Sequence, residues 1–84
     1  MNPTYQALLE SLAKLLTARI EMRQLELKRF MRYRADAIAC GHSTTTENEK
    51  LALKRLASLN KQIASLGSAL SNIGSAAQSE LEHQ

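Results

Sequence analysis

An apolar residue recurs at alternating intervals of four and three positions in the second half of the chain, and this repeat restricts the fold more than any other feature. Its members are Ala52, Leu56, Leu59, Ile63, Leu66, Leu70, Ile73 and Ala77. Such spacing places the apolar side chains along one side of an α-helix and is typical of helices that pack in coiled coils and bundles. It predicts a long helix with a single apolar seam.

A first helix is predicted from about Pro3 to about Ala39. Asn2 followed by Pro3 is a start signal, because Asn caps helices and Pro at the first helical position has no N–H to leave unpaired. The same alternating spacing gives this helix a seam of Leu9, Ala13, Leu16, Ile20, Leu27, Phe30 and Ala37. Arg23 and Arg34 interrupt it. The seam is widened on one side by Leu8, Leu12, Leu15, Met22 and Leu25.

The two helices are expected to be joined by a short turn over about residues 40–45. Gly41 can adopt the left-handed conformation that closes a helix. After it, both Thr44 with Glu47 and Thr46 with Glu49 match the spacing of a capping box, so the second helix should run from about 46 to about 80. We expect its end beyond Gly74 to fray unless a partner covers it.

These elements predict an all-α fold, a single domain spanning residues 1–84, in which two long antiparallel helices form a coiled-coil-like hairpin. Two helices enclose only a thin seam and leave part of their apolar surface exposed. The hairpin is therefore expected to complete a bundle, either by dimerisation or with another protein.

A catalytic site needs a nucleophile beside a base, or paired carboxylates in a cleft. The only candidates are Cys40 and His42, two residues apart at the predicted turn, and His83 lies far from them beyond the end of the second helix. A metal site needs three or four ligands, which this pattern does not supply. We expect Cys40 to pack at the helix end and His42 to be solvated. No enzyme activity, metal, cofactor or small-molecule substrate is expected.

The net charge is +3, and six of the eleven Lys and Arg residues fall between positions 19 and 34. Basic residues on a helix can neutralise phosphates, which indicates a small dimeric nucleic-acid-binding regulator as one hypothesis. The same residues could instead attract an acidic protein partner or simply be solvated. The residues concerned are Arg23, Lys28, Arg29, Arg32 and Arg34.

The favoured hypothesis is a non-catalytic protein–protein interaction module, a small adaptor or chaperone that binds through its apolar helix stripes. Met31 and Tyr33 lie off the predicted seam of the first helix. Met and aromatic side chains are over-represented in interface cores, which favours both residues as contacts for a partner. The predicted partner-binding residues are Leu56, Leu59, Ile63, Leu66, Leu70, Ile73, Met31 and Tyr33.

A cytoplasmic location is expected from three features of the sequence. The single Cys40 cannot form an internal disulfide, and the first residues lack the form of a signal peptide. No stretch approaches the roughly 20 apolar residues that a membrane-spanning helix requires.

The chain resembles the short helical-hairpin co-chaperones of bacterial type III secretion. The likeness lies in its size, its two helices, the Gly41 turn, and the Leu and Ile stripe from Leu56 to Ile73 followed by small residues. In that family the hairpin joins a tetratricopeptide-repeat chaperone and holds the needle subunit unpolymerised in the cytoplasm. The resemblance implies a hetero-complex in which the stripe of one helix docks on a repeat protein.

Overall fold

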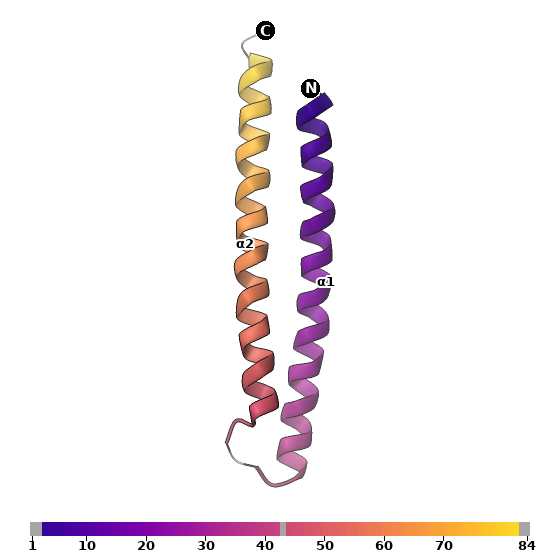
Figure 1. Ribbon diagram of the computed structural model, residues 1–84, viewed down its shortest axis with the longest axis vertical. Coiled ribbons are helices and arrows are strands. Elements are labelled where there is room, and N and C mark those ends of the chain that lie inside the picture. Colours follow the sequence, from indigo (N-terminus) through magenta and orange to yellow (C-terminus); the bar gives the residue numbers. More distant parts are fainter. Residues whose placement is uncertain (1–2, 43, 83–84) are drawn as a thin grey trace.

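A computed structural model describes residues 3–42 and 44–82 of the chain. It contains two α-helices, α1 over Pro3–Ala39 and α2 over Glu47–Glu82. The helices run side by side in opposite directions, and the molecule is an elongated rod of 66 × 15 × 13 Å with its turn at one end (Figure 1). The predicted all-α helical hairpin is confirmed.

The helix bounds agree closely with those expected from the sequence. α1 has the predicted limits, while α2 begins one residue later, at Glu47, and continues to Glu82 instead of ending at about residue 80. The start of α2 differs because Thr46 is the capping residue and lies just outside the helix. The predicted cap at Asn2 and the last two residues, 83–84, lie outside the described residues.

α1 ends in a Schellman motif centred on Gly41. The backbone N–H of His42 donates to the carbonyl of Ala37 at 2.9 Å, and that of Gly41 donates to the carbonyl of Ile38 at 3.0 Å. Gly41 has a φ of 82°, a left-handed conformation that carries little penalty for a residue without Cβ. The predicted role of Gly41 in closing the helix is therefore confirmed.

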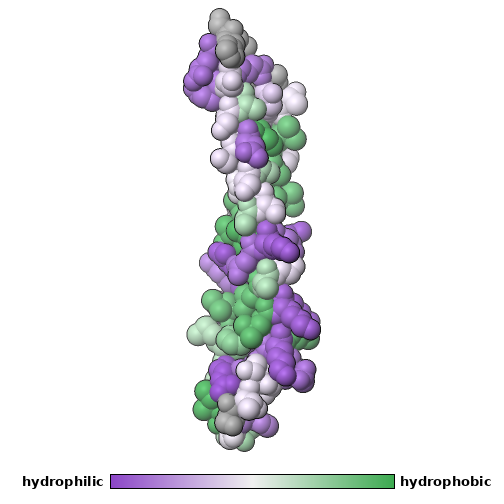
Figure 2. Space-filling model, turned by 90° about the vertical axis from the view of Figure 1, so that its left-hand side faces the viewer, coloured by the Kyte–Doolittle hydropathy of each residue, from purple (hydrophilic) through white to green (hydrophobic). Residues whose placement is uncertain are grey.

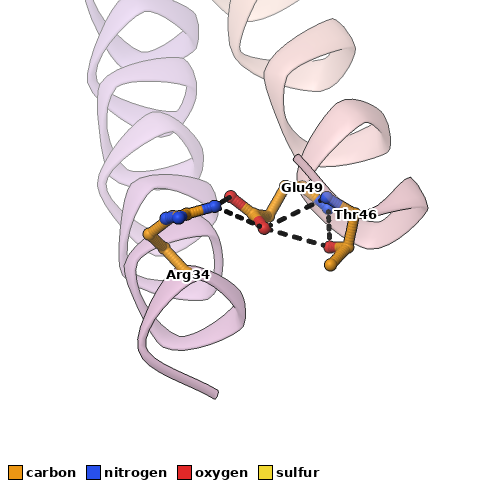
Figure 3. A network of polar contacts seen from close by, with 3 residues as sticks. All are labelled: Arg34, Thr46 and Glu49. Carbon is orange, nitrogen blue, oxygen red and sulfur yellow. Dashed lines mark hydrogen bonds and ion pairs between the residues drawn. The ribbon is translucent and has the colours of Figure 1, made fainter. Parts of the chain in front are cut away.

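α2 begins with a complete capping box, shown in Figure 3. The backbone N–H of Glu49 donates to the Thr46 hydroxyl at 3.3 Å, and the backbone N–H of Thr46 donates to Glu49 Oε1 at 3.2 Å. Of the two capping boxes that the sequence allowed, the one formed by Thr46 and Glu49 defines the helix. A capping Thr contributes about 1 kcal/mol to helix stability.

The seam of α2 lies where its repeat predicts. Ala52, Leu59 and Ala77 are buried, and the remaining five members of the repeat are half-buried, while the intervening positions are mostly exposed. The apolar repeat of α2 is thus the surface that packs against α1.

The seam of α1 differs from the prediction at alternate positions. Leu9, Leu16, Ile20 and Phe30 are half-buried and Ala37 is buried, as expected, but Ala13 and Leu27 are exposed. The contact surface instead includes Leu12, Arg19, Arg23, Glu26, Tyr33 and Arg34. Counted from Leu9, the buried and half-buried positions recur after three and then four residues, whereas the predicted seam assumed four and then three. The predicted seam positions Ala13 and Leu27 are therefore wrong, and a charged residue, Glu26, is buried in place of Leu27.

Candidate interaction surface

The turn end of the hairpin is held by a buried carboxylate between the two helices. Glu49 of α2 is 1% exposed, and Arg34 of α1 reaches across to donate to both of its carboxylate oxygens, at 3.3 and 3.2 Å (Figure 3). The Thr46 hydroxyl and backbone N–H donate to the same carboxylate. Burial acts to raise the pKa of Glu49, but these hydrogen bonds and the charge of Arg34 outweigh it, so its pKa lies below its usual range.

The advantage of wild type over a Glu49→Gln variant is expected to depend on pH. Because folding lowers the pKa of Glu49, its carboxylate stabilises the hairpin above the ordinary glutamate pKa of about 4.3. This contribution is lost as the pH falls through the lowered pKa. Urea unfolding should therefore show wild type as the more stable protein at neutral pH, and the two proteins should converge in acid.

Glu47→Gln is the matched control for this measurement, since the Glu47 side chain is 90% exposed and, among the described residues, forms an ion pair only with the exposed Lys50 of its own helix. Its effect on stability should be small at every pH. A difference between wild type and Glu49→Gln that stays constant from neutral to acidic pH would contradict the role given to the Glu49 charge.

A second buried carboxylate lies midway along the seam. Glu26 is 4% exposed, and it forms ion pairs with Arg29 on its own helix at 3.1 Å and with Arg55 of α2 at 3.6 Å. Its Oε1 is buried and accepts no hydrogen bond from the described residues. This oxygen is also the atom that lies 3.6 Å from Arg55 Nη1, so the ion pair with Arg55 compensates its charge without a hydrogen bond.

One side of α1 carries a stripe of exposed apolar side chains beside the seam. Leu8, Leu15 and Met22 are spaced seven residues apart and share a face, and each is 44–46% exposed. Leu25, one turn beyond Met22, is 56% exposed. We call these four residues the N-terminal stripe. The sequence identified them as widening the seam but did not show that α2 would leave them uncovered.

A separate group of exposed apolar residues lies nearer the turn. Leu27, Met31 and Ile38 are spaced by four and seven positions and share another face of α1, and Leu53 is exposed on α2. We call them the turn-proximal group. Figure 2, which views the molecule from the α2 side, shows hydrophobic surface beside hydrophilic surface in the half nearer the turn.

The predicted partner-binding residues fall into two sets. Those of α2 face α1, with Leu59 buried and Leu56, Ile63, Leu66, Leu70 and Ile73 half-buried. On α1, Met31 is 61% exposed, whereas Tyr33 is half-buried at the seam. Their binding of a partner stays a prediction, and Met31 is the member that the hairpin leaves most accessible.

The predicted basic patch is partly used inside the hairpin. Arg23 donates to Asn60 across the seam at 3.1 Å, Arg29 pairs with Glu26, and Arg34 pairs with Glu49. Lys28 and Arg32 are exposed, and neither forms an ion pair in the described part of the chain. The cations available to an outside ligand are thus fewer than the sequence indicates.

Cys40 and His42 are both exposed at the turn. The expected packing of Cys40 at the helix end is wrong, since it lies beyond Ala37, the last buried residue of the α1 seam. Within residues 3–42 and 44–82, no cluster of three His, Cys, Asp or Glu side chains could hold a metal ion.

Comparison with known proteins gives no relative for this chain: no protein-family model, curated protein or solved structure matches it. Among the described residues, neither helix has a stretch long and apolar enough to cross a membrane.

Proposed function

We propose that this chain is a non-catalytic protein–protein interaction module, a small adaptor or chaperone that binds other helices through apolar surface. The observation that carries the proposal is the imbalance between its core and its surface. Only four hydrophobic residues are buried among those described, and three of them are Ala: Ala37, Ala52, Leu59 and Ala77. By contrast, ten large hydrophobic residues are exposed, including the whole N-terminal stripe.

The imbalance favours a partner because contiguous exposed apolar surface is uncommon on proteins that act alone. Burying it against further helices would extend the two-helix seam into a bundle. Both a second copy of the chain and a different protein could supply those helices. In the second case, the resemblance to type III secretion co-chaperones offers a specific form of the proposal, an adaptor in the cytoplasm that works as part of a hetero-complex.

The proposal is tested by replacing three members of the N-terminal stripe together, as Leu8→Ser, Leu15→Ser and Met22→Ser. Association is measured by light scattering across a concentration series and by crosslinking of the tagged chain in an extract of its native cells. We expect wild type to form a defined complex, with itself or with one protein, that the triple variant loses while its circular dichroism stays helical.

The matched control replaces two exposed apolar residues of α2 that belong to neither the N-terminal stripe nor the turn-proximal group, as Leu51→Ser and Leu81→Ser, which are 47% and 43% exposed. This variant should keep the complex. A well-folded monomer that crosslinks to nothing, or an association equally strong in wild type and the triple variant, would overturn the proposed role of the stripe.

A second candidate function, a basic regulator that binds nucleic acid as a dimer, is favoured by one observation. Lys28 and Arg32 are exposed and unpaired in the described structure, four residues apart on one face of α1. If these residues contact phosphates, binding of labelled duplex DNA should weaken steeply with salt, and Lys28→Ala with Arg32→Ala should reduce that dependence. Absence of binding at low salt would remove this candidate.

A further inference from the structure

A shallow groove runs along the side of the hairpin that carries the N-terminal stripe. It consists of two adjoining hollows of about 390 and 400 Å³, which share Ser58. Its apolar residues come from both helices: Leu15, Met22, Leu25, Leu59 and Leu66. We call this surface the side groove. Because both helices line it, an occupant lying in it would contact α1 and α2 together.

The rim of the side groove is positively charged. Arg19, Arg29, Arg55 and Lys61 line it, and the one carboxylate among its lining residues is the buried Glu26. Arg29 and Arg55 are already paired with that carboxylate. Arg19 donates only to the sulfur of Met22, at 3.3 Å, a weak acceptor, and Lys61 forms no ion pair with any described residue. Two cations beside apolar surface are therefore available to an anionic partner.

The spacing along the groove matches that of side chains on a helix. Leu15 lies in one hollow and Met22 in the other, seven residues apart, which corresponds to about 10 Å along α1. Two apolar residues at positions i and i+7 of an incoming helix are separated by the same distance, and helices commonly dock in grooves through such anchors.

We propose that the side groove binds an amphipathic helix of another protein, with apolar anchors at i and i+7 in the two hollows and Asp or Glu on its flanks beside Arg19 and Lys61. This inference rests on the proposed function and specifies the partner. A second copy of the chain fits less well, because the same groove on two copies would bring like-charged rims together.

The test uses two labelled synthetic peptides of about 20 residues, long enough to form five helical turns. Both carry Leu at i, i+4 and i+7, and their flanking positions are Glu in one peptide and Lys in the other. Fluorescence anisotropy with the full chain should show the Glu peptide binding about tenfold more tightly, a difference of about 1.4 kcal/mol. Raising the salt from about 0.05 to about 0.5 M should reduce that preference.

Variants then locate the site. Leu15→Ser with Met22→Ser should weaken binding of the Glu peptide about tenfold, and Arg19→Glu with Lys61→Glu should reverse the preference between peptides. Leu51→Ser with Leu81→Ser, at exposed apolar positions that line neither hollow of the groove, is the control and should bind as wild type does. Helix content is checked by circular dichroism for each variant.

Equal affinity for the two peptides, or binding insensitive to the groove variants, would overturn the inference. Competition by duplex DNA that depends on Arg19 and Lys61 would also overturn it, in favour of nucleic acid. A dimer that Leu15→Ser with Met22→Ser disrupts would assign the groove to a second copy and leave the proposed function intact. If neither peptide binds and the chain shows no association of any kind, both proposals fail.

Discussion

Leu59→Ala is expected to lower the free energy of unfolding by about 2 to 5 kcal/mol, the range for removing a buried leucine side chain. Leu59 is 7% exposed and is the one large hydrophobic side chain among the four buried hydrophobic residues described. Its loss removes that side chain's packing and leaves a cavity between the two helices. The measurement is the free energy of unfolding from urea titration, with circular dichroism as the probe.

Two substitutions serve as controls for Leu59→Ala. Leu59→Met conserves volume and should cost less than about 1.5 kcal/mol, whereas Leu53→Ala, at a position 46% exposed, should change stability by no more than about 0.5 kcal/mol. A cost below about 1 kcal/mol for Leu59→Ala would mean that the seam is not a packed core in the isolated chain.

Replacing both interior glycines of α2, as Gly67→Ala and Gly74→Ala, is expected to stabilise the hairpin by about 1 to 2 kcal/mol. Glycine weakens a helix because the unfolded chain loses more conformational freedom on folding. A Cβ added at either position would meet no atom within 4 Å, and neither residue has a left-handed backbone. The gain should appear as a higher urea midpoint for the double variant than for either single variant.

Gly41→Ala provides the opposite case, because its φ of 82° strains any residue with a Cβ, and it should destabilise the chain. If the double variant of Gly67 and Gly74 were less stable than wild type, α2 would have to pack more closely at these positions than the structure shows. If it is more stable, the folded hairpin itself does not require either glycine.

The ends of the helices were predictable because their signals are local. Gly41 and the pairing of Thr46 with Glu49 act within a few residues of the positions they define, so the sequence alone predicts the turn. The α2 seam was predictable for a related reason. Its repeat is uninterrupted, and no other face of that helix offers a comparable run of Leu and Ile.

The α1 seam was only partly predictable because two registers compete there. One register contains Ala13 and Leu27, and the other contains Leu12 and Glu26, so apolar content favours the first. The structure has the second, in which Arg55 of α2 lies 3.6 Å from Glu26. One of the two ion pairs of Glu26 is therefore made with the other helix, so no pattern within α1 could reveal that Glu26 is buried.

The candidate interaction surface depended on the same choice of register. The apolar character of Leu8, Leu15, Met22 and Leu25 is visible in the sequence, but which of them α2 covers follows only from the seam. Likewise, Arg19 of α1 and Lys61 of α2 line the same hollow only because of the way the two helices pair. The seven-residue spacing of Leu8, Leu15 and Met22, which runs parallel to the seam, is the signal in the sequence that could have indicated an apolar face beside it.

The exposed apolar residues change sides halfway along α1, from the N-terminal stripe to the turn-proximal group. The body between those two flanks is the pair of packed helices, with a cross-section of 15 × 13 Å. Helices resting on opposite flanks would therefore be separated by the hairpin itself and also staggered along its 66 Å length. Partners bound to both flanks would thus be kept apart by the rod and would not contact each other.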